Sequence, residues 1–112
     1  MRILAAALLL LASCGAPPVP SPEDERVLRP IPDAPEAARP HLERGDETFV
    51  RASAAQRGDD GAAALDLYRR ARSSYLQAEA LCGGFIPPPL IDRATECVNR
   101  IAALQRQVHT NK

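Results

Sequence analysis

Proline divides this chain into a part that resists helix formation and a part that permits it. Eight of the eleven prolines fall between Gly15 and Pro40, and the other three are consecutive at positions 87–89. Proline lacks an amide hydrogen and disfavours helix at the residue before it, so we expect residues 14–40 to form a disordered, proline-rich linker without a packed core. In polyproline II geometry the 26 residues from Gly15 to Pro40 would reach at most about 80 Å. Stable helices are expected only beyond this linker.

Apolar residues at helical spacing predict three helices in the remaining segment. The clearest pattern predicts a helix over residues 60–82, which Asp59 or Asp60 can cap and which Gly83 and Gly84 end. Its apolar positions recur at intervals of three or four residues: Leu65, Tyr68, Ala71, Tyr75, Ala78 and Cys82. The triple proline then leads into a helix over 89–109, with the stripe Leu90, Ala94, Cys97, Ile101, Leu104 and Val108.

The least regular pattern predicts a helix over residues 41–57. It carries Leu42, Phe49, Ala52 and Ala55, contains Gly45, and is followed by Gly58 as a C′ residue. Three helices joined by short connections pack as antiparallel neighbours, so the predicted fold is a small all-α, three-helix domain over residues 41–112.

The amino terminus has the organisation of an export signal. Arg2 precedes ten apolar residues, Ile3 to Ala12, and small residues follow. Ten residues of helix cover about 15 Å, half of a bilayer's hydrocarbon core, so a permanent membrane-spanning helix is disfavoured. We expect residues 1–13 to be removed as a signal peptide.

The sequence Leu11-Ala12-Ser13-Cys14 resembles the lipobox of bacterial lipoproteins, L-[AS]-[GAS]-C, at every position. This resemblance implies cleavage before Cys14 and a diacylglycerol on its sulfur, which with further acylation is a durable membrane anchor. Gly15 stands where an Asp retains the lipoproteins of enteric bacteria at the inner membrane, so the expected location is the outer membrane, facing the periplasm. The alternative is an ordinary secretory signal with an incidental cysteine.

Lipidation of Cys14 leaves two cysteines, Cys82 and Cys97, in an oxidising compartment. We expect them to form a disulfide, since both lie on apolar stripes of consecutive helices. Closing a loop of ~15 residues would contribute about 3 kcal/mol to stability. The objection is that Cys97 lies ~12 Å along its helix, and the alternative is a pair of buried, inert thiols.

The helical hairpin also has a family resemblance. Ala64, Tyr68 and Ala71, after a Gly-Asp turn and a preceding helix with small residues, resemble the second half of a tetratricopeptide repeat over roughly residues 42–78. The resemblance implies a protein-binding helical hairpin. The Trp, Leu and Gly positions of the first helix are not matched and there is no second copy, so an ordinary hairpin is the alternative.

No pattern in the sequence predicts an enzyme, a cofactor or a metal site. His41 and His109 lack a ligand residue four positions away and are expected to face solvent. The single carboxylates Asp66, Glu79, Asp92 and Glu96, together with the neighbouring Arg93 and Arg100, are interpreted as solvated helix faces. With 14 basic and 14 acidic residues, the chain has no electrostatic footprint for nucleic acid.

The expected function is therefore that of a small lipid-anchored envelope protein, an adaptor or accessory subunit that contacts an unidentified envelope partner. A structural or lytic lipoprotein that bridges the periplasm is the alternative, and an envelope enzyme or ligand carrier is a third, less favoured one.

Overall fold

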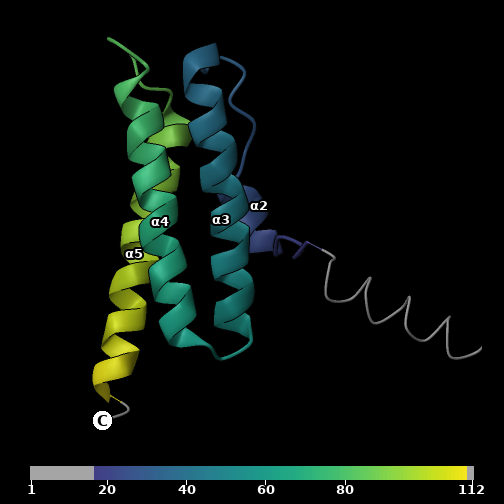
Figure 1. Ribbon diagram of the computed structural model, residues 1–112, viewed down its shortest axis with the longest axis vertical. Coiled ribbons are helices and arrows are strands. Elements are labelled where there is room, and N and C mark those ends of the chain that lie inside the picture. Colours follow the sequence, from purple (N-terminus) through teal and green to yellow (C-terminus); the bar gives the residue numbers. More distant parts are fainter. Residues whose placement is uncertain (1–16, 111–112) are drawn as a thin grey trace, which may run out of the picture.

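Three long helices run antiparallel in this protein (Figure 1). The computed structural model describes residues 17–110, and this range contains helices and no strand. The elements are α2 (Pro22–Val27), the short 3₁₀ helix η1 (Glu36–Ala38), α3 (Arg39–Arg57), α4 (Gly61–Ala80) and α5 (Pro88–Thr110). The predicted all-α class is confirmed, and the ends of the long helices lie within two residues of the predicted ones. The predicted signal peptide and Cys14 lie outside the described residues.

Local sequence accounts for the turn between α3 and α4. Asp60 caps α4, because its side chain accepts a hydrogen bond from the amide of Ala63 at 3.1 Å. Gly58 is the last half-helical residue of α3, and the left-handed residue after it is Asp59, with a φ of 61°. The sequence expectation that Gly58 would be the C′ residue was therefore off by one position. Aspartate tolerates this conformation better than most residues with a side chain.

The predicted stripes form the core. Phe49, Tyr68 and Tyr75 are completely buried, and Leu90 and Cys97 from α5 are buried with them. α4 packs against both α3 and α5, whereas α3 and α5 approach each other mainly through long side chains. α4 is therefore the central helix of the domain.

Gly45 explains how α3 can approach α4 so closely. A Cβ atom at this position would lie 2.5 Å from Cε1 and 2.7 Å from Cδ1 of Tyr75. Only glycine leaves room for the tyrosine ring there, so the residue that weakens the helical pattern of α3 is required by its packing.

The proline-rich segment is packed against the helices, which contradicts the expectation of a disordered linker through residue 40. Residues 21–38, here called the strap, bury Asp24, Ile31, Ala34 and Ala38. α2 lies beside α5, and η1 contacts α3 and α4. Figure 1 shows the strap on the right-hand side of α3, rising from α2 to the start of that helix.

The prolines permit this packing because they stand at helix starts and in extended stretches. Pro22 occupies the first turn of α2, where its missing amide hydrogen is not needed. Ser21 and Asp24 form a capping box, with each side chain accepting from the other residue's amide at 3.1 and 3.0 Å. The proline content correctly predicted that residues 17–38 form no long helix. It did not reveal that this segment packs against the helices.

Candidate functional site

Two arginines of α5 fill the space between α3 and α5. Arg93 is 2% exposed, and its guanidinium donates to both carboxylate oxygens of Asp46 on α3, with an Nε–Oδ1 distance of 2.8 Å. The same guanidinium donates to the carbonyl oxygen of Arg29 in the strap at 2.8 Å. Tyr75 donates to Asp46 at 2.7 Å, so this one carboxylate links all three long helices.

Arg100 makes the second bridge, two helical turns after Arg93 on α5. Its guanidinium donates to Asp24 in the strap at 2.9 Å, to the Tyr68 hydroxyl at 3.0 Å and to Glu96 at 2.8 Å. The guanidinium carbon lies 4.6 Å from the centroid of the Phe49 ring, a cation–π geometry. Arg100 therefore holds the strap to the helices by both its charge and its flat surface.

The environment of Asp24 keeps this carboxylate ionised despite complete burial. Burial alone would raise its pKa, but hydrogen bonds from Ser53 and from the amide of Ser21, together with Arg100, hold the pKa below its usual value. Burial alone would lower the pKa of Arg100. The hydrogen-bonded partners of its guanidinium outweigh this effect, so the pKa is raised. The Asp24–Arg100 pair is thus fully charged at neutral pH.

A polar cleft of about 710 Å³ opens beside this pair, between α2, α3 and α5. Its walls contain carboxylates, guanidiniums, amides and hydroxyls, contributed by Ser21, Pro22, Glu23, Asp24, Arg26, Ser53, Gln56, Arg57, Glu96, Asn99, Arg100 and Ala103. Its most buried charges, Asp24 and Arg100, pair with each other and attach the strap to α5. Arg57 donates to the carbonyl oxygen of Val19, just before the strap, at 3.1 Å.

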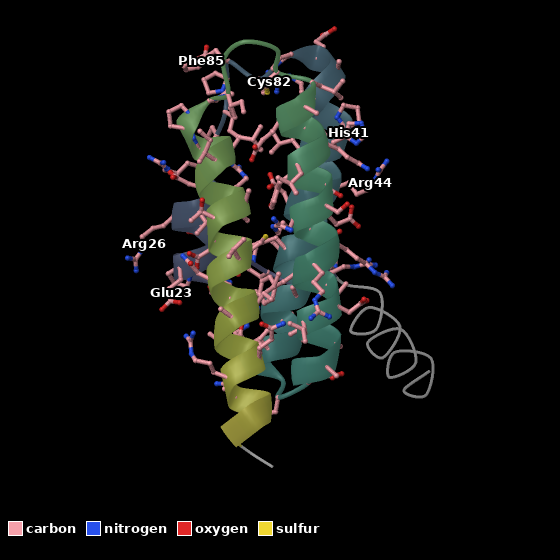
Figure 2. The ribbon with its side chains drawn as sticks, turned by 90° about the vertical axis from the view of Figure 1, so that its left-hand side faces the viewer. Glu23, Arg26, His41, Arg44, Cys82 and Phe85 are labelled. Atoms are coloured by element: carbon pink, nitrogen blue, oxygen red, sulfur yellow. The ribbon has the colours of Figure 1, made fainter. Side chains whose placement is uncertain are left out.

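A different groove lies between α4 and α5, on the face turned toward the viewer in Figure 2. This α4–α5 groove has a volume of about 530 Å³ and is lined by Arg69, Arg72, Val98, Ile101, Ala102 and Gln105. Val98 is 46% exposed. Leu76, four residues after Arg72 on α4, and Ile91, seven residues before Val98 on α5, are 40% and 45% exposed and lie at helical spacing from the groove. We call the groove and these two residues the α4–α5 face.

The expected disulfide between Cys82 and Cys97 is not formed in the structure, where both residues are free thiols. Cys82 follows the end of α4 and donates to the carbonyl oxygen of Ala78 at 3.3 Å. Cys97 lies nine residues into α5, about 13 Å along its axis from Pro88. The axial offset keeps the two sulfurs apart, and burial raises the pKa of Cys97 to about 12.

The remaining candidate residues form no reactive cluster among the described side chains, and no group of three or more potential metal ligands occurs there. His41 was expected to face solvent, but it is half-buried. Its Nδ1 has no hydrogen-bond partner within the described structure. The side chain of His109 lies outside the described part. Asp66 and Asp92 are exposed and pair with Arg70 and Arg29. No helix within residues 17–110 has the length and apolarity needed to cross a bilayer.

The interpretation of Arg93 and Arg100 as members of a solvated helix face was wrong. Both lie three or four residues from buried positions of the α5 stripe, which was the signal that they point inward. The partners of both arginines could not be found by local spacing, since Asp46 and Asp24 are 47 and 76 residues away in sequence.

Comparison with protein-family models, curated proteins and solved structures found no match for this chain.

Proposed function

We propose that this protein is a small, non-catalytic adaptor of the bacterial cell envelope, anchored by lipid at Cys14, which contacts a partner protein through its α4–α5 face. The observation that carries this proposal is the row of exposed apolar side chains on that face, Leu76, Ile91 and Val98. Exposed apolar surface beside a groove is typical of interaction sites in proteins of this size.

The place where the described residues begin supports the choice of the α4–α5 face as the partner-binding side. The described chain starts beyond α3, on the right of Figure 1, whereas α4 and α5 lie on the left. An anchor attached on the α3 side leaves the α4–α5 face turned away from the membrane. A partner protein in the periplasm can then reach it.

The packed strap favours an adaptor over a protein that bridges the periplasm. A bridge needs the long reach of an extended proline-rich segment, and residues 21–38 use most of that segment to cover the helices. Deleting residues 17–40 would therefore be no clean test of a bridge, because it also removes Asp24 and the other buried strap residues from the folded domain.

The anchor is tested by the intact mass of the protein purified from envelopes. We expect loss of residues 1–13 and the mass of a multiply acylated Cys14. Cys14→Ser is expected to prevent acylation and signal removal, whereas the matched variant Cys82→Ser keeps both. An unmodified mass that begins at Met1 in the wild type contradicts the envelope proposal.

The adaptor role is tested by co-purification from membranes. We expect a stoichiometric partner that is retained by the wild-type protein and lost in Val98→Arg, which places a charge on the exposed α4–α5 face. Arg51→Glu on the exposed surface of α3 is the control and should retain the partner. Recovery of no stoichiometric partner, or equal recovery with both variants, contradicts the proposed role of this face.

A further inference from the structure

We propose that the α4–α5 groove binds an acidic, amphipathic helix of the partner protein. The inference rests on the proposed function and deepens it, because it states the chemistry of the segment that the groove recognises. Three properties of the groove carry it: its apolar floor, its unneutralised positive charge and its position on the molecule.

The apolar surface has the dimensions of a helix-binding site. Val98, Ile101 and Ala102 line the groove, and Ile91 lies seven residues before Val98 on the same side of α5. On α5, Ile91 and the groove residues together extend over 14 residue steps, from Ile91 to Gln105, or about 21 Å of helix axis, which corresponds to about four turns of a bound helix. Helices that dock in such grooves present apolar residues at intervals of three, four and seven positions.

The charge of the groove selects the polar residues of that helix. Arg69 and Arg72 line it, and no aspartate or glutamate is among its lining residues. Neither arginine makes an ion pair within residues 17–107, while the nearby Asp66 pairs with Arg70 at 3.0 Å. A segment with carboxylates beside its apolar residues can therefore pair with both guanidiniums without breaking an internal ion pair.

A second copy of this chain is a poorer occupant. Two copies that meet through the same groove about a twofold axis bring the four guanidiniums of Arg69 and Arg72 toward each other, and like charges across an interface oppose association. The groove's own composition therefore favours a different, acidic chain.

A membrane surface is also a poorer occupant. The described chain enters on the α3 side, and the α4–α5 face lies on the other side of the domain. Lipid attached upstream of residue 17 would therefore hold the opposite side of the domain toward the bilayer.

The test measures peptide binding to the full, naturally processed protein held in nanodiscs of zwitterionic lipid. The probe is a labelled synthetic helix of about 18 residues with leucines along one face and glutamates beside them. A matched peptide has lysine in place of every glutamate. We expect the glutamate peptide to bind at least about tenfold more tightly than the lysine peptide, with the difference diminishing at high salt.

Variants locate the binding site. Arg69→Glu combined with Arg72→Glu should weaken the glutamate peptide at least about tenfold and reverse the preference between the two peptides. The matched control is Arg70→Glu, an exposed arginine on the same helix that does not line the groove. It should change the affinity by less than about twofold.

Each contrary outcome overturns the proposal. The first two outcomes are equal affinity for the two peptides and an effect of Arg70→Glu as large as that of the double variant. The third is a dimer that dissociates on Val98→Arg. The fourth is binding to anionic vesicles that depends on Arg69 and Arg72, without any peptide binding. A photo-crosslinker at Gln105 gives the cellular counterpart, and the cross-linked segment should be acidic and of helical apolar spacing. A stoichiometric partner that cross-links through a basic segment would overturn this inference and leave the adaptor role standing.

Discussion

The helix pair α3–α4 and the helix pair α3–α5 are joined in opposite ways. α3 and α4 meet through glycine, alanine and aromatic rings, with Gly45 admitting the ring of Tyr75. α3 and α5 are instead joined by Arg93 and Arg100, and the strap supplies part of the partners of both. The first junction depends mainly on shape, with hydrogen bonds from Tyr68 and Tyr75 to α3 in addition, and the second depends on charge. Different perturbations should therefore affect each of them.

The largest effect is expected from Arg100→Ala, which removes the cation from Asp24. An ionised carboxylate with no exposed surface is then left without its charged partner, and we expect a loss of about 3–5 kcal/mol of unfolding free energy. Chemical denaturation followed by circular dichroism measures this. Arg51→Ala, an exposed arginine of α3, is the control and should change stability by no more than about 0.5 kcal/mol.

The double variant Asp24→Ala with Arg100→Met sharpens the interpretation. Removing both charges avoids the unpaired carboxylate, so the double variant should be more stable than Arg100→Ala alone. Losses that simply add up across the two sites would show that the pair is not coupled.

Acid should act selectively on the charged junction. The pKa of Asp24 is lowered in the folded protein, so its contribution is fully present above the unfolded value of 3.8 and is lost as the pH falls through the lower, folded value. We expect wild-type stability to fall more steeply below about pH 4 than that of Asp24→Asn. Parallel curves for the two proteins would contradict a role for Asp24 ionisation.

The shape-dependent junction should respond to one added methyl group. Gly45→Ala gains helix propensity but places its Cβ against Tyr75, and overpacking of this kind costs about 1–3 kcal/mol. Gly61→Ala is the matched control, since nothing lies within 4 Å of a Cβ there. We expect lower thermal stability for the first variant and unchanged or higher stability for the second.

The smallest effect is expected at the exposed ion pair between the strap and α5. The Arg29 and Asp92 side chains are more than half exposed, although their atoms approach to 2.8 Å. Arg29→Ala should therefore cost less than about 1 kcal/mol, and the carbonyl oxygen that accepts from Arg93 is retained. A loss as large as that of Arg100→Ala would refute the distinction between buried and exposed bridges.

The contrast between the two junctions also explains which parts of the fold could be predicted from the sequence. Apolar spacing reports which side of a helix is buried, so the stripes of α4 and α5 and the all-α class were predictable from residues such as Tyr68 and Leu104. The same method treats every arginine as a surface residue. Arg93 and Arg100 depend on partners brought close only by the tertiary fold, and the packing of the strap depends on those partners.

Proline content misled for a related reason. Its local effect is to interrupt helices, and it does so between α2, η1 and α3. It does not prevent Ile31 and Ala34 from contacting a core that the rest of the chain provides. Likewise, apolar spacing placed Cys82 and Cys97 on neighbouring stripes, whereas the axial offset of Cys97, which the sequence also indicated, agrees with the free thiols of the structure.

Because the strap is packed against the helices, the tether between Cys14 and the folded domain is short. Seven residue steps separate Cys14 from Ser21, where the strap's capping box begins, and a chain of that length spans at most about 25 Å. A lipid on Cys14 would confine the α4–α5 groove to a thin layer beside the bilayer. A longer tether would let the groove move further from the membrane. For a partner in the same membrane, such confinement raises the effective concentration toward the millimolar range, where a groove of modest intrinsic affinity is sufficient.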